Sequence, residues 1–112
     1  MSADQPIHPK ASALLAYLSG HIGRGNGVSA KEIARWIGWP ERDVRKYVTE
    51  LRERGHAVCA HPKEGYYIAE TAEELEHACA FLHGRAMQSL KLIARLRKVS
   101  LPDLLGQLRM AT

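Results

Sequence analysis

The residues best suited to a binding chemistry are three cations in one short stretch, IGWPERDVRKYVTELRERG, at positions 37–55. Arg42, Arg45 and Lys46 lie close together in it. An arginine can donate two hydrogen bonds to one guanine, and a lysine can reach either a base or a phosphate. Acidic residues are interspersed with these cations, so the same stretch also fits an ordinary solvated helix face. The elements around the stretch decide between these two interpretations.

The hydrophobic residues of this stretch predict a helix with one buried side. Val44, Val48 and Leu51 recur at the i, i+4, i+7 spacing of an amphipathic helix. At about 100° per residue, the opposite side carries Arg42, Lys46, Thr49 and Glu53, with Arg45 on its flank. The cations therefore gather on the outer face of the N-terminal half. That is the end at which a recognition helix meets base edges in the major groove of DNA.

Local start and stop signals predict a tight turn between this helix and the one before it. Ser29 and Glu32 form a capping box that opens the earlier helix. Gly38 suits the left-handed conformation that ends it. Pro40 can start the next helix, which stops near Gly55. Trp39, between the two helices, is expected to fill the gap between them.

The neighbouring segments complete the order of a winged helix-turn-helix. An apolar helix, KASALLAYLSG, precedes the pair, and GRGNG at 23–27 is predicted to be a flexible linker. After the pair, HAVCA and GYYIA are two short β-prone runs joined by a Pro- and Gly-containing loop, which predicts a hairpin. We therefore expect a mainly α fold with a small β-hairpin wing at residues 10–69, after a flexible leader at 1–9.

Further contacts to a duplex are expected outside the charged helix. The amides at the start of the second helix, around Ser29 and Lys31, could hold a phosphate. His61 and Lys63 lie in the expected hairpin loop, where they could touch the flanking backbone. The full set of candidate DNA-binding residues is Ser29, Lys31, Glu41, Arg42, Arg45, Lys46, Thr49, His61 and Lys63.

The span from Lys10 to Ala69 resembles the N-terminal winged-helix domain of the biotin operon repressor family. The matching motifs are VSAKEIARWIG, WPERDVRKYVTELRERG and HAVCAHPKEGYYIA. The resemblance implies that the second motif is the recognition helix, with Arg42, Arg45 and Lys46 against DNA, and that the third motif is the wing. Pro40 departs from the family, which usually has a Ser or Thr cap there. The remaining residues are too few for a biotin ligase domain, so no biotin chemistry is implied. A looser similarity is to stand-alone regulators of bacteria and phages.

A long helix is predicted over residues 70–99, opened by a second capping box at Thr71 and Glu74. Its apolar stripe, at spacings of 4, 3, 4, 4 and 3, consists of Leu75, Cys79, Leu82, Ala86, Leu90 and Ile93. One small domain has too little surface to cover five turns of stripe, so we expect a homodimer formed through it. A two-fold dimer could read a palindromic site. Residues 100–112 are expected to form a short terminal helix or tail.

Catalysis and cofactor binding have little support in the sequence. No glycine-framed nucleophile or phosphate-binding loop is present, and GRGNG lacks the Lys-Ser/Thr of such a loop. Cys59 with His61, and Cys79 with His83, lack the C-x-x-C spacing typical of zinc sites, so we expect neither metal nor cofactor. Two cysteines without a disulfide framework favour a cytoplasmic setting. No segment is apolar enough for a membrane span.

Taken together, these patterns predict a sequence-specific double-stranded DNA-binding protein rather than an enzyme. We expect a dimeric transcriptional regulator, most often a repressor, of bacterial or phage type. The mildly basic balance, a formal net charge of +4, permits a polyanionic partner without requiring one. Two alternatives stay open: a winged-helix adaptor that binds a protein of the replication or transcription machinery, and a regulator that senses a ligand or metal.

Overall fold

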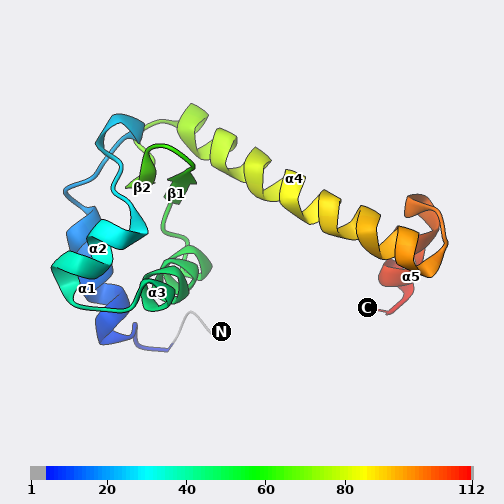
Figure 1. Cartoon of the computed structure of the whole chain (residues 1–112), viewed down its shortest axis with the longest axis horizontal. Coiled ribbons are helices and arrows are strands. Elements are labelled where there is room, and N and C mark those ends of the chain that lie inside the picture. Colours follow the sequence, from blue (N-terminus) through cyan, green and yellow to red (C-terminus); the bar gives the residue numbers. More distant parts are fainter. Residues whose placement is uncertain (1–4, 112) are drawn as a thin grey trace. The chain divides into compact units, whose positions relative to one another are not determined.

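The computed structural model describes residues 5–111 and confirms a mainly helical fold with a two-stranded hairpin and a long helix (Figure 1). The elements in chain order are α1 (Pro9–Leu18), the short 3-10 turn η1 (Arg24–Asn26), α2 (Ala30–Ile37), α3 (Glu41–Glu53), β1 (Val58–His61), β2 (Gly65–Ile68), α4 (Ala72–Arg97) and α5 (Leu101–Ala111). They form two compact units, here called the winged unit, up to Ala78, and the C-terminal unit, from Cys79. The boundary between the units falls inside α4. No helix within the described residues is long and apolar enough to cross a bilayer.

The core of the winged unit lies where α1 and α2 pack against α3 (Figure 1). The three helices contribute fully or almost fully buried side chains, namely Leu14, Leu18, Ile33, Val44, Val48 and Leu51. These are apolar positions that recur at helical spacing in the sequence, and each helix buries one stripe of them. The buried side of α3 fixes which of its residues point outward.

The turn between α2 and α3 is built as the sequence predicts. Gly38 adopts a left-handed conformation with φ of 82°, and its amide donates to the carbonyl of Ala34 at 2.8 Å. Pro40 precedes α3 and supplies no side-chain cap. Trp39 packs against the core, with its ring centroid 5.7 Å from that of Tyr47. The aromatic contact thus helps to set the entry of α3 in place of a capping side chain.

The wing is a hairpin with a third segment along its edge. β1 and β2 pair antiparallel, with Val58 opposite Ile68 and His61 opposite Gly65. Val28 bridges to Tyr66 on the outer side of β2, with both backbone hydrogen bonds formed. A Cβ atom at Gly65 would collide with the backbone of Val28, and Gly65 has φ of +82°, so this position requires glycine.

The GRGNG segment is more constrained than the linker predicted from sequence. The amide of Gly23 donates to the carbonyl of Ile68 at 2.8 Å, and the side chain of Asn26 donates to the carbonyl of Ile22 at 2.8 Å. The amide of Arg24 donates to a carboxylate oxygen of Glu74 at 2.9 Å. These bonds tie the segment to β2 and to the first turn of α4.

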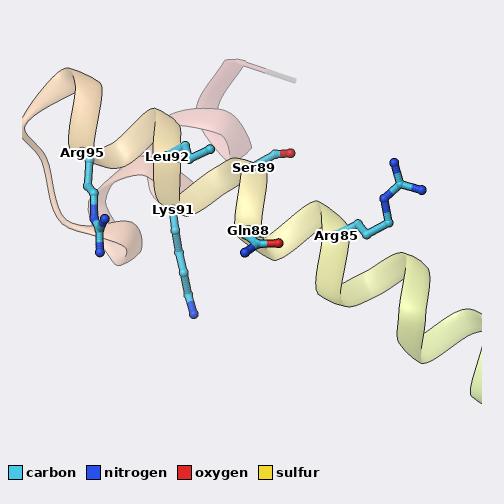
Figure 2. A pocket seen from close by; sticks show the side chains of 6 residues that line it. All are labelled: Arg85, Gln88, Ser89, Lys91, Leu92 and Arg95. Carbon is cyan, nitrogen blue, oxygen red and sulfur yellow. The ribbon is translucent and has the colours of Figure 1, made fainter.

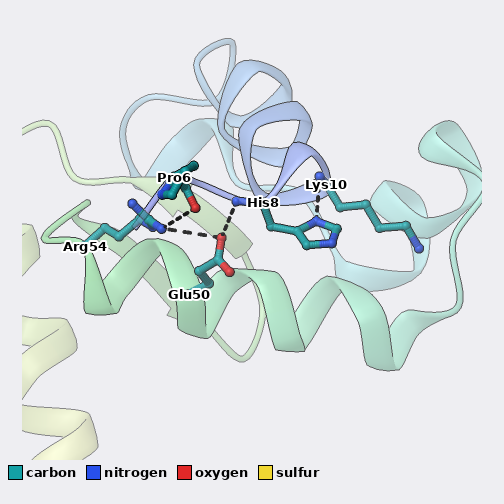
Figure 3. A network of polar contacts seen from close by, with 5 residues as sticks. All are labelled: Pro6, His8, Lys10, Glu50 and Arg54. Carbon is teal, nitrogen blue, oxygen red and sulfur yellow. Dashed lines mark hydrogen bonds and ion pairs between the residues drawn. The ribbon is translucent and has the colours of Figure 1, made fainter. Parts of the chain in front are cut away.

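Part of the predicted flexible leader belongs to the folded unit (Figure 3). Residues 1–4 lie outside the described residues, but Ile7 packs against the core and Pro9 already begins α1. The amide of His8 donates to Glu50 Oε2 at 3.2 Å, and Arg54 Nη2 donates to the carbonyl of Pro6 at 2.9 Å. The winged unit therefore starts before Lys10, because the end of α3 offers polar partners to this segment.

The C-terminal unit consists of the rest of α4 and the helix α5 (Figure 1). Ala94 of α4 and Leu104 of α5 are buried in it. Lys98 takes a left-handed conformation with φ of 56°, which ends α4 and reverses the chain. Ser100 Oγ accepts from the amide of Asp103 at 3.2 Å and so caps α5. The predicted long helix and short terminal helix are both present.

Candidate nucleic-acid interface

The outer face of α3 presents the charged residues singled out in the sequence. Arg42, Arg45, Lys46 and Thr49 are exposed, while Val44 and Val48 are buried on the opposite side. Thr49 Oγ1 donates to the carbonyl of Arg45 at 3.1 Å, one turn earlier. The face is therefore solvent-accessible along the N-terminal half of α3, and its position follows from the buried stripe.

The cations on this face differ in their availability. Arg45 Nη2 lies 3.5 Å from Glu41 Oε2, an exposed ion pair on one turn of the helix. Such pairs contribute little to stability and exchange readily for another anion. Lys46 Nζ lies 5.5 Å from the centre of the Tyr47 ring. Within the described residues, neither Arg42 nor Lys46 forms an ion pair. Arg42 and Lys46 are thus the cations most open to a polyanion.

The start of α2 is capped from within the chain. Ser29 Oγ accepts from the amide of Glu32 at 3.1 Å, which confirms the predicted cap. Lys31 is exposed beside it. Glu32 lies in the first turn and opposes an anion there. Phosphate binding at the start of α2 stays a prediction. Lys31 is the exposed cation there that could contact the phosphate.

The side chain of His61 forms contacts within the wing and is not simply exposed at its tip. Its Nδ1 lies 3.1 Å from the amide of Lys63 and 3.2 Å from that of Glu64, both of which donate to it. Its Nε2 lies 2.7 Å from Arg24 Nη2. Contact between His61 and DNA stays a prediction, but Nδ1 already accepts from two backbone amides and Nε2 faces Arg24. Lys63 remains exposed.

Arg24 is a cation of the wing that sequence reasoning missed. It sits in GRGNG, for which the sequence predicts a linker, yet its guanidinium contacts His61 in β1. Its amide donates to Glu74, whose other carboxylate oxygen accepts from the amide of Glu70 at 2.8 Å. These backbone hydrogen bonds, first that of Glu70 and then that of Arg24, lower the pKa of Glu74. No local motif signals this position of Arg24, because it depends on contacts across 37 residues.

The predicted dimer stripe of α4 is largely uncovered within this chain. Leu75, Leu82 and Ile93 are 38%, 44% and 38% exposed, and Cys79 and Ala86 are exposed as well. Leu90 differs because it is half-buried. Leu96, which was not assigned to the stripe, is 82% exposed. An uncovered stripe is compatible with a partner helix, and the exposed apolar side chains continue past Ile93 to Leu96.

The positive charge of the chain is concentrated in the C-terminal unit. Residues 1–78 carry ten Lys and Arg against eleven Asp and Glu, a net charge of −1. Residues 79–112 carry six against one, a net charge of +5. The winged unit thus has cations at particular places but no overall attraction for a polyanion.

The two cysteines have different surroundings. Cys59 is buried, and its Sγ lies 3.8 Å from the carbonyl oxygen of Ala57. Cys79 is exposed on α4. Within residues 5–111, no three His, Cys, Asp or Glu side chains come together as ligands for a metal ion.

Comparison of the chain with protein-family models, with curated proteins and with solved structures finds no match. The resemblance to the biotin operon repressor therefore stays an expectation from sequence motifs.

Proposed function

We propose that this protein is a sequence-specific double-stranded DNA-binding protein that acts as a dimeric transcriptional regulator, most simply as a repressor. The observation that carries the proposal is the outer face of α3. Arg42 and Lys46 are exposed and lack ion pairs within the described residues, on a helix whose opposite side is buried. α3 follows α2 through a tight turn and precedes a hairpin, which is the order of a winged helix-turn-helix.

The mechanism is binding rather than catalysis. α3 would enter the major groove, where Arg42 can donate a bidentate pair of hydrogen bonds to a guanine and Lys46 can reach a base or phosphate. Lys63 and Arg24 in the wing would contact the flanking phosphates, which position a module without carrying sequence information. Arg45 would exchange its ion pair with Glu41 for one with a phosphate, because the exposed pair is weak.

A titration of the protein with two duplexes tests this function. Fluorescence anisotropy would compare the fragment upstream of its own gene with a scrambled duplex of equal composition, across a salt series. Wild type should prefer the first duplex, and both affinities should fall with salt as counterions are released. Arg42→Ala should reduce the preference by roughly 5- to 150-fold, the equivalent of about 1–3 kcal/mol for a bidentate base contact.

Arg42→Lys is the matched control, because it keeps the charge and loses the planar fork of donors. Loss of preference in both variants would indicate base recognition by Arg42. A phosphate contact would instead lower both affinities alike in Arg42→Ala, leave the preference unchanged, and be restored by the lysine variant. The absence of binding to either duplex at low salt would refute α3 as a groove reader.

The dimer part of the proposal depends on the uncovered stripe of α4. Leu75, Cys79, Leu82 and Ala86 are followed at the same alternating spacing of three and four residues by Ser89, Ile93 and Leu96. This is the repeat by which two helices pack side by side in a coiled coil. A second copy of α4 would cover side chains that are exposed in the single chain, such as Leu82 and Leu96.

The charge order of α4 favours an antiparallel pair. Its first turn is acidic, with Glu73 and Glu74, and its last turn is basic, with Arg95 and Arg97. A parallel pair would bring like charges together at both ends, whereas an antiparallel pair sets the acidic end of one copy beside the basic end of the other. Such a pair with Leu82 opposite Ala86 of the second copy matches a large side chain with a small one.

A winged-helix adaptor that binds a protein partner is the second candidate, and Trp36 favours it. Trp36 is 73% exposed, at the edge of a hollow of about 400 Å³ that is also lined by Tyr17, His21 and Glu32. The rings of Tyr17 and His21 stack at 5.2 Å, and burial together with Glu32 raises the pKa of Tyr17. Exposed tryptophan is common where proteins bind one another. The DNA titration separates this candidate from the first.

A further inference from the structure

The second half of α4 carries a groove whose cations have no role in the fold. The groove has a volume of about 390 Å³ and is lined by Arg85, Gln88, Ser89, Lys91, Leu92 and Arg95 (Figure 2). Figure 2 shows Lys91 and Arg95 extending to the same side of the helix, with Gln88 and Arg85 in the preceding turns. We refer to these six residues as the basic groove.

The cations of the basic groove are not neutralised by the chain. Within the described residues, Arg85, Lys91 and Arg95 form no ion pair with a carboxylate. The C-terminal unit contains a single acidic residue, Asp103, at the start of α5. These exposed cations therefore stay available to an external anion.

We propose that the basic groove binds the phosphate backbone of a nucleic-acid duplex. Arg85 and Arg95 are ten residues apart, which is about 15 Å along a helix. Because a strand winds around the duplex axis, neighbouring phosphates lie farther apart than their rise of about 3.4 Å, so a straight groove of this length can meet roughly two or three of them. Gln88 and Ser89 add neutral donors between the cations. Figure 2 shows Arg85 extending to the other side of the helix from Lys91 and Arg95, so the cations lie on both sides of the groove. Cations spread along a helix in this way suit an extended polyanion better than a compact acidic ligand.

This inference rests on the proposed DNA-binding function. It also accounts for how a winged unit of negative net charge could be attracted to DNA. The winged unit has a net charge of −1, so it cannot attract DNA from a distance by itself. The C-terminal unit, at +5, supplies that attraction without sequence preference. Arg95 and Lys91 lie on the side of α4 turned away from Leu75, Leu82 and Ile93, so a helix partner would leave most of the groove open; Ser89 borders both faces.

The test is a salt series with the triple variant Arg85→Ala, Lys91→Ala and Arg95→Ala, on the same two duplexes. The variant should bind both more weakly by a similar factor, on the order of 10- to 100-fold, so that the preference between them is unchanged. The slope of log affinity against log salt should fall in magnitude by about 2–3, since each lost phosphate contact removes about 0.9.

A charge control separates a local site from a change in net charge. Ser12, Ala13 and Ala16 are exposed on α1, and their replacement by glutamate lowers the net charge by the same three units without touching the groove. This variant should keep most of the wild-type salt slope. If it reproduces the loss seen in the triple variant, the groove is not the binding site.

The remaining outcomes distinguish this inference from the proposed function. An unchanged salt slope in the triple variant, together with a lost preference in Arg42→Ala, would overturn the groove and leave α3 as the reader. A reduced slope in the triple variant with no effect of Arg42→Ala would support the groove and refute base recognition by α3. Absence of DNA binding by the wild type would overturn both.

Discussion

At the scale of single residues, Glu74 shows how one side chain can join distant segments. Its two carboxylate oxygens accept from the amides of Arg24 and Glu70, and its own amide donates to Thr71 Oγ1 at 3.1 Å. The capping role follows from the Thr71–Glu74 spacing, but the bond to Arg24 does not, since it spans 50 residues. Glu74 thus fastens GRGNG to the first turn of α4.

Acid titration should reveal this role of Glu74. Its pKa is lowered in the folded state by the backbone hydrogen bonds, so its carboxylate stabilises the fold above the ordinary pKa of 4.5. That stabilisation is lost as the pH falls through the lowered pKa. Glu74→Gln should therefore reduce the melting temperature at pH 7, and the gap to wild type should narrow as the pH drops below 4.5. Thermal melts between pH 2.5 and 7 would measure this.

Glu73→Gln provides the matching control, because Glu73 lies in the same turn and accepts none of these bonds. Its melting curve should follow that of wild type across the same pH range. A gap for Glu74→Gln that stays constant with pH would mean that its carboxylate charge does not contribute.

At the scale of elements, the wing depends on a close approach of two backbones. Gly65 combines a positive φ with a backbone neighbour, Val28, where a side chain would begin. Gly55 has φ of +88° but open space around it, and Gly25 has neither constraint. A side chain at Gly55 would therefore meet backbone strain alone, one at Gly65 would meet strain and a steric collision, and one at Gly25 would meet neither.

Alanine substitutions at these three glycines should lower the free energy of unfolding, measured by urea denaturation, by different amounts. Gly55→Ala should cost about 1 kcal/mol from backbone strain alone. Gly65→Ala should cost about 2–4 kcal/mol, because strain and collision add. Gly25→Ala should change stability by less than about 0.5 kcal/mol. Equal losses at Gly55 and Gly65 would contradict the close approach at the wing.

The same scale shows how far sequence could predict this fold. Helix limits at Ser29, Gly38 and Ser100 follow from local capping chemistry and agree with the structure. The edge pairing of Val28 with Tyr66 and the anchoring of His8 to Glu50 join residues tens of positions apart, where single-sequence patterns carry no signal. The α3 face was predictable because burial of one stripe determines the opposite one. The basic end of α4, with Lys91 and Arg95, is evident from the sequence, but the groove that Arg85 lines with them is not.

At the scale of the whole molecule, the antiparallel pairing that we propose for α4 would have a defined register. The arrangement that sets Leu82 opposite Ala86 of a second copy also sets Cys79 opposite Ser89, and Leu75 opposite Ile93. The two Cys79 thiols would then lie about 15 Å apart along the helices, too far for a disulfide. A parallel pair would instead place the two Cys79 side by side.

Oxidative cross-linking on a non-reducing gel distinguishes these dimers. Wild type should give little covalent dimer, and Ser89→Cys should give much more through Cys79 of the other copy. Adding Cys79→Ala to Ser89→Cys should abolish it. Efficient cross-linking of wild type would indicate parallel helices, and a monomer by light scattering at high concentration would refute pairing through α4.

The contrast between the two cysteines has a consequence for measuring local opening. Cys59 is buried, so a thiol reagent can reach it only when the winged unit opens, and its slow modification rate reports the free energy of that opening. Cys79 is exposed in the single chain, so at concentrations too low for the proposed dimer its rate supplies the intrinsic reactivity of an accessible thiol. The ratio of the two rates would thus give the free energy of local opening of the winged unit without denaturant or mutation.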